Sequence, residues 1–149
     1  MVKLVPHAYV HVDHLAWRPW DDARKAPFVA HGARGSAEVK VLARDPETTA
    51  ESLLYRLEPG WSADRITNTV YENVLVLEGA IDVGDRKLGR HVFTYRPEGH
   101  ETGPVSSPEG ATILSFAGRP ESSRRRTRWR GSTRSRSSGS RSTSATSTG

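Results

Sequence analysis

The sequence predicts an all-β protein, and the pattern fits a small antiparallel β-barrel or sandwich. Short runs rich in β-branched and aromatic residues recur through the first 118 residues, and clusters of Pro, Gly, Asp and Ser separate them. Helical periodicity is weak, and we expect at most one helical turn at DDARKA, residues 21–26. Many short strands joined by closely spaced turns are typical of small barrels and sandwiches.

The strands follow one another from the N-terminus. Leu53, Tyr55 and Leu57 share one face of an expected strand and Leu54, Arg56 and Glu58 the other, which is the two-residue period of a β-strand. Residues 74–77 are apolar on both faces, as in a strand covered on both sides. Gly79 permits a tight reversal after that strand. The expected strands are AYVHVDHLAW (8–17), AEVKVLAR (37–44), ESLLYRLE (51–58), ENVLVLEG (72–79), AIDVGD (80–85, with a turn at Gly84-Asp85), HVFTYR (91–96) and ATILSF (111–116).

The net charge of +5 belongs to the C-terminal segment. Residues 119–149 contain nine of the 22 basic residues and one acidic residue, Glu121, so residues 1–118 carry 13 basic and 16 acidic side chains. Trp129 is the only large apolar residue of this segment, which therefore has too little surface to bury to offset the entropy of ordering. We expect one folded domain at residues 1–118 and a disordered Arg/Ser-rich tail at residues 119–149.

Several functional classes are excluded by what the sequence lacks. It has no cysteine, which excludes disulfides and thiolate sites, and it has no Gly-rich phosphate loop or Gly-x-Ser-x-Gly motif. No apolar run is long enough for a membrane span, and MVKLVPHAYVHVDH lacks the apolar segment of a secretory signal. We therefore expect a cytoplasmic protein with no membrane partner.

Three stretches carry a resemblance to a known family. Gly60, Glu72 and Gly79 in GWSADRITNTVYENVLVLEG have the spacing of a first motif, and LGRHVFTYRPEGHETGPV follows in the position of a second. With the opening YVHVDHLAWRPW, these stretches span most of residues 8–118. The chain resembles the cupins, and more narrowly the small single-domain cupins related to ChrR-type anti-sigma factors and to acetylacetone dioxygenase. The resemblance implies a jelly-roll β-barrel for residues 1–118.

The first motif lacks the histidines that the resemblance calls for. Its glutamate matches Glu72, but its two histidine positions fall on Ile66 and Asn68 or, with a longer spacing, on Arg65 and Thr67. Neither alignment supplies an imidazole, and asparagine offers only a weak neutral oxygen.

The second motif also lacks its histidine. Pro97 and Gly99 match, but the histidine position is Thr102. His100 lies two residues earlier, and a shift of two residues keeps a side chain on the same face of a strand. The metal ligands that we predict, if a metal binds, are Asn68, Glu72 and His100, with Glu101 as an alternative to His100.

The resemblance implies that relatives hold zinc, iron or a similar divalent ion in the barrel, and that some use it for dioxygenation or sensing. Because three of the four expected ligands are missing, we expect a degenerate, weak metal site and a role in small-molecule binding or in structure. The alternative is a metal-dependent dioxygenase or isomerase. We also expect a homodimer formed through the outer sheet, with a contribution from residues 9–17. The candidates to line the ligand pocket are Tyr55, Tyr71, Phe93 and Tyr95.

Two further features have competing interpretations. His7, His11 and His14 are clustered, but in an extended strand position 14 faces away from 7 and 11, so we interpret this segment as an edge strand rather than a metal site. The arginine-rich tail predicts weak, nonspecific contact with nucleic acid. Its abrupt start at Arg119-Pro120 equally fits a vestigial segment or one read out of frame.

Overall fold

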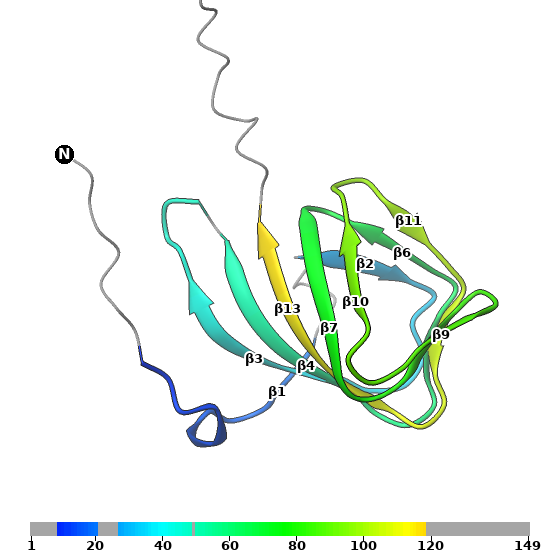
Figure 1. Cartoon of the computed structure of the whole chain (residues 1–149), viewed down its shortest axis with the longest axis horizontal. Coiled ribbons are helices and arrows are strands. Elements are labelled where there is room, and N and C mark those ends of the chain that lie inside the picture. Colours follow the sequence, from blue (N-terminus) through cyan, green and yellow to red (C-terminus); the bar gives the residue numbers. More distant parts are fainter. Residues whose placement is uncertain (1–8, 21–26, 49, 119–149) are drawn as a thin grey trace, which may run out of the picture.

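A computed structural model describes residues 9–20, 27–48 and 50–118, and within these ranges the chain is all-β, as predicted (Figure 1). The helix in these ranges is a single 3-10 turn, η1 (Val12–His14). The described part of the chain contains no helix with the length and hydrophobicity that crossing a membrane requires. The helical turn predicted at 21–26 and the disordered tail predicted at 119–149 lie outside the described residues.

The strands form three antiparallel sheets. This arrangement corrects the predicted barrel, because hydrogen bonds do not close the sheets into one continuous ring. The six-stranded sheet has the order β1 (Arg18–Pro19), β3 (Ala37–Arg44), β4 (Glu51–Leu57), β13 (Ala111–Gly118), β7 (Tyr71–Gly79) and β10 (Phe93–Arg96). The three-stranded sheet has the order β11 (Glu101–Thr102), β6 (Arg65–Asn68) and β2 (Phe28–His31). The four-stranded sheet has the order β5 (Trp61–Ala63), β12 (Val105–Ser107), β8 (Ile81–Val83) and β9 (Arg86–Leu88).

The hydrophobic core lies between the six-stranded sheet and the two smaller sheets, since all three contribute to it. The alternation predicted for residues 51–58 is confirmed, because Leu53, Tyr55 and Leu57 are all buried in this core. In β7, Val74 and Val76 face the core, whereas residues 75 and 77 are half-buried on the opposite face.

Gly79 ends β7, but the strands on either side of it do not form the hairpin that a tight reversal predicts, because β8 pairs with β12 and β9 in another sheet and not with β7. The φ of Gly79 is +71°, a conformation that favours glycine. A Cβ at this position would also overlap the carbonyl oxygen of Gly110, which lies in the turn before β13. The turn predicted at Gly84-Asp85 is present, between β8 and β9.

The N-terminal segment is not the edge strand that the sequence predicts. In the described part of this segment, residues 9–20, only Arg18 and Pro19 pair with β3, while η1 contacts that strand through a hydrogen bond between Lys40 and Val12. Lys40 points to the outer face of β3 and is only 7% exposed, so its ammonium needs a partner there. It donates a hydrogen bond of 2.9 Å to the carbonyl oxygen of Val12 and lies 4.7 Å from the ring centre of Trp17. These contacts favour a coiled segment over an extended one.

The turn at η1 also changes the arrangement of the histidines. His11 and His14 stack with their ring centres 4.2 Å apart, instead of pointing to opposite sides as in an extended strand. Both rings are exposed, and His7 lies outside the described residues. The prediction that position 14 faces away from position 11 is therefore wrong.

Candidate functional site

Glu72 lies at the centre of a buried polar cluster. It is the second residue of β7, its side chain points into the core, and it is 0% exposed. Its neighbours in the sheet are Ala117 of β13 and Arg96 of β10. The alternation of β7 accounts for this direction, because Val74 and Val76 follow Glu72 at intervals of two residues on the same face.

Among the described residues, three side chains donate hydrogen bonds to the Glu72 carboxylate. The phenol of Tyr55 donates to Oε1, as does the hydroxyl of Ser115, at 2.8 Å. The side-chain amide of Asn68 donates to Oε2 at 2.9 Å. Strand β13 lies between β4 and β7, so the phenol spans β13 to reach the carboxylate and Ser115 joins from β13 itself. Both carboxylate oxygens are therefore engaged.

Arg96 supplies the positive charge of this cluster. It is the last residue of β10, lies opposite Glu72 in the register, and is only 7% exposed. Its Nη1 lies 3.8 Å from Oε2 of Glu72, an ion-pair distance rather than a hydrogen-bond distance.

The hydroxyl of Tyr55 is held in its neutral form by this environment. Burial raises the pKa of the phenol well above its ordinary value of 10.0, and the negative charge of Glu72 raises the pKa further. The positive charge of Arg96 acts in the opposite direction. Tyr55 is therefore a hydrogen-bond donor to Glu72 and not a base.

The structure brings two of the three predicted metal ligands together. Asn68, at the end of β6, and Glu72 are hydrogen-bonded to each other and almost completely buried. His100 lies in the turn between β10 and β11, where its main chain pairs with that of Asn68 while its side chain is exposed. Its alternative, Glu101, is also exposed and forms an ion pair of 3.6 Å with Arg65.

The side chains of the polar cluster are not a suitable set of ligands for a divalent transition-metal ion. Such an ion needs several imidazole or carboxylate ligands, but Glu72 already accepts hydrogen bonds at both oxygens and has a guanidinium beside it. Within residues 9–20, 27–48 and 50–118, no group of three or more His, Asp or Glu side chains is placed to hold a metal ion. The ligand set Asn68, Glu72 and His100 stays a prediction, which metal analysis has to test.

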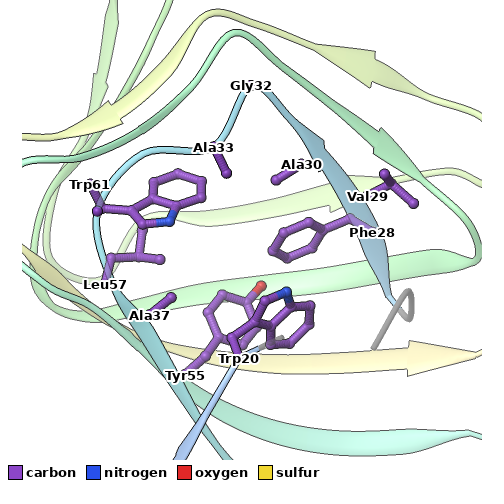
Figure 2. A pocket seen from close by; sticks show the side chains of 11 residues that line it. Trp20, Phe28, Val29, Ala30, Gly32, Ala33, Ala37, Tyr55, Leu57 and Trp61 are labelled. Carbon is purple, nitrogen blue, oxygen red and sulfur yellow. The ribbon is translucent and has the colours of Figure 1, made fainter. Parts of the chain in front are cut away.

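An aromatic pocket of about 480 Å³ lies beside this cluster (Figure 2). Trp20 and Phe28 stack with ring centres 5.0 Å apart, and Tyr55 meets both rings edge-on at 5.9 Å. Figure 2 shows Trp61 across the pocket from Phe28. The described residues that line the pocket are Trp20, Phe28, Val29, Ala30, Gly32, Ala33, Gly35, Ala37, Tyr55, Leu57 and Trp61. None of them is charged.

Of the four aromatic residues predicted to line the ligand pocket, Tyr55 lines the aromatic pocket, whereas Tyr71, Phe93 and Tyr95 do not. Phe93 and Tyr95 are each 60% exposed on the outer face of β10, which corrects the prediction. The reason is strand alternation: Arg96 faces the core, so its neighbour Tyr95 faces away. Tyr71 lines a different cavity, next to Phe116 on the outer face. The homodimer predicted to form through the outer sheet stays a prediction.

Sequence reasoning missed Arg96 and most of the aromatic pocket. Arg96 could be identified only from the pairing of β7 with β10, because Glu72 and Arg96 become neighbours only in that register. Phe28 stands in the short run APFVAHG between a proline and a glycine, which is itself a strand signal. Trp20 and Trp61 are 41 positions apart, and nothing in their spacing indicates that they meet around one cavity.

Comparison with known proteins confirms the predicted cupin fold. No protein-family model and no curated protein matches the sequence. Acetylacetone dioxygenase from Acinetobacter johnsonii matches the structure with a TM-score of 0.63 at 14% identity, over 78% of this chain and 76% of that one. An RmlC-like cupin protein from Ralstonia eutropha JMP134 matches with a TM-score of 0.59 at 15% identity, over 76% and 69% of the two chains. The anti-sigma factor ChrR, in complex with SigE from Rhodobacter sphaeroides, matches with a TM-score of 0.51 at 18% identity, over 72% and 51%.

Proposed function

We propose that this protein is a small-molecule-binding domain with a cupin fold and a degenerate metal site, and that its ligand is a flat, uncharged, largely apolar molecule. The observation that carries this proposal is the aromatic pocket. Its volume of about 480 Å³ lies in the range of small-molecule sites, and its lining side chains are mostly apolar and aromatic, although main-chain groups make much of the surface polar.

The lining sets the chemical class of the ligand. The polar side-chain atoms among the described lining residues are the indole nitrogens of Trp20 and Trp61 and the phenol oxygen of Tyr55. The phenol already donates to Glu72. Because none of the described lining residues is charged, they offer a charged ligand no partner for the hydration that it would lose. Aromatic faces instead favour stacking with a ring.

Binding of 2-naphthol, a flat two-ring probe, tests this proposal. We expect saturable quenching of tryptophan fluorescence and a rise in melting temperature. The matched variant is Ala33→Phe, because Ala33 is exposed at the pocket and a larger side chain there fills the space without disturbing the core (Figure 2). This variant should fold normally and lose the quenching. Equal quenching in both proteins would show that the probe binds elsewhere and would refute the proposal.

The degenerate metal site is supported by the engagement of both Glu72 oxygens and by the exposed position of His100. Metal analysis of the purified protein tests it against the alternative, a metal-dependent dioxygenase or isomerase. We expect less than about a tenth of an equivalent of tightly held metal, unchanged in Glu72→Ala. One equivalent of zinc or iron that is lost in Glu72→Ala would favour the enzyme.

The weak nucleic-acid contact predicted for the tail lies outside the described residues and stays a prediction. Deleting residues 119–149 and measuring nucleic-acid affinity against salt concentration tests it. The contact predicts a smaller salt dependence after deletion, because arginine–phosphate contacts release counterions. An unchanged dependence would eliminate it.

A further inference from the structure

We infer that the guanidinium of Arg96 takes over the charge-balancing role of a metal ion, so that the interior of this domain carries its own built-in cation. The inference goes beyond ligand binding and rests on the proposed loss of the metal site. The two can fail separately, because metal content tests the lost site, whereas the coupling between Arg96 and Glu72 tests the role of the guanidinium.

The register of the six-stranded sheet places this cation. Arg96 in β10 is directly opposite Glu72 in β7, and paired residues of neighbouring antiparallel strands project to the same side. The two side chains are 8% and 0% exposed, and the distance between Nη1 and Oε2 is 3.8 Å. Among the described residues, Arg96 is the only basic side chain that forms an ion pair with Glu72.

The residues at the vacated histidine positions cannot supply this charge. Asn68 and Thr102 are neutral, and both have a buried side-chain oxygen without a hydrogen-bond partner, Oδ1 and Oγ1 respectively. Asn68 helps Glu72 only by donating through its amide. A buried carboxylate without a nearby positive charge is strongly destabilising, so the remaining source of compensation is the guanidinium.

Arg96 also acts on the aromatic pocket through Glu72. The carboxylate that it balances accepts the hydrogen bond of Tyr55, and the ring of Tyr55 forms part of the pocket wall. Arg96 does not line the aromatic pocket itself, but it lines a small adjoining cavity that shares Phe28, Tyr55 and Trp61 with that pocket, and we therefore treat it as a positioning residue.

A double-mutant cycle on the full-length chain tests the inference. Arg96→Met leaves Glu72 as an unpaired buried charge, and we expect the melting temperature to fall by about 10–20 °C. Combining it with Glu72→Gln removes both charges. The new amide can still accept from Tyr55 and Ser115, and Asn68 can rotate to offer its unpartnered Oδ1. We expect this double variant to melt within about 5 °C of the wild type.

The control is Arg86→Met, at an exposed arginine of β9, which should change the melting temperature by less than about 3 °C. Should Arg96→Met fail to fold while the double variant folds, the inference is supported as well. It is overturned if Arg96→Met melts like the wild type. It is also overturned if the double variant melts no higher than Arg96→Met or fails to fold with it, since Arg96 would then matter for a reason other than the charge of Glu72.

Discussion

The polar cluster around Glu72 and the aromatic pocket share Tyr55, but they differ in what they leave available. In the cluster, both oxygens of the carboxylate are engaged and its charge is balanced by Arg96, all within the core. In the pocket, aromatic rings from separate segments surround a space of about 480 Å³ that the described side chains do not fill. In the cluster the described side chains contact both carboxylate oxygens, whereas in the pocket they leave space unoccupied.

This difference shows where binding specificity can reside. A carboxylate that already has three donors and a cation gains little from a metal or a polar ligand. Phe28, Tyr55 and Trp61 are themselves only 3–5% exposed, so a ring in the pocket would cover their remaining edges together with the half-buried Trp20. Burial of apolar area is favourable and nearly independent of direction. We therefore expect substitutions in the cluster to act on stability and substitutions in the pocket to act on ligand affinity.

Removing the carboxylate at the centre of the cluster should have the largest effect. Glu72→Ala leaves Arg96 as an unpaired buried charge and removes the acceptor for three donors, so we expect a loss of about 3–5 kcal/mol in the free energy of unfolding, measured in urea. Glu78→Ala, at an exposed glutamate of the same strand, is the matched control and should cost less than about 0.5 kcal/mol. Equal losses in the two variants would contradict a special role for the cluster.

Removing the shared phenol should have the next largest effect. Tyr55→Phe keeps the ring in the pocket wall but takes one donor from Glu72, so we expect a loss of about 1–3 kcal/mol in unfolding free energy at neutral pH. Affinity for 2-naphthol should change little, because the ring remains. A large loss of affinity with unchanged stability would contradict this prediction, because it would show that the phenol acts on ligand binding and not on the stability of the cluster.

The same tyrosine predicts a pH dependence. Its pKa is raised in the folded protein, so above about pH 10 the unfolded chain releases the phenolic proton first, and stability falls as pH rises from there. Below that pH the contribution is fully present. Unfolding in urea at several pH values between about 9 and 11.5 should therefore show the wild type losing its advantage over Tyr55→Phe. A constant difference across this range would contradict the raised pKa.

On the pocket side, Phe28→Leu should cost only about 1 kcal/mol of unfolding free energy, since it exchanges one buried apolar side chain for another. It removes the ring that stacks on Trp20, so affinity for a flat ring should fall several-fold in a fluorescence titration. Phe28 is already buried in the core, so unchanged affinity with a large loss of stability would show that it has no part in binding.

The smallest effect is expected at His100. Its side chain is exposed, so His100→Ala should change the unfolding free energy by less than about 0.5 kcal/mol and should leave the metal content of the purified protein unchanged. Loss of bound metal in this variant would restore His100 as a ligand and would contradict the degenerate site.

Much of the fold could be predicted because strand alternation and turn glycines are local signals. The buried face of β4 and the end of β7 at Gly79 follow from a few neighbouring residues each. The N-terminal segment could not be predicted in this way. An apolar, β-branched run looks like an edge strand, but the buried ammonium of Lys40 bonds to Val12, and that contact depends on tertiary structure.

The central residue of the candidate site, Glu72, could be predicted from the sequence, but the residues around it could not. Family spacing points to Glu72, and the structure places that carboxylate in the core. Arg96 could not be found from local pattern, because a charged residue at a strand end usually faces solvent and only the pairing of β7 with β10 shows otherwise. For the same reason Tyr95, which must face away from Arg96, was expected on the wrong side.

The pairing of Glu72 with Arg96 also bears on how strands β7 and β10 reach their correct register during folding. A slip of one residue between β7 and β10 would turn Arg96 outward and leave Glu72 alone among apolar side chains. A slip of two residues would bring Thr94 or Glu98 opposite the carboxylate, and neither carries a positive charge. Each misaligned state is therefore penalised by an isolated charge, so this single pair discriminates against trapped conformers that the apolar residues alone would tolerate.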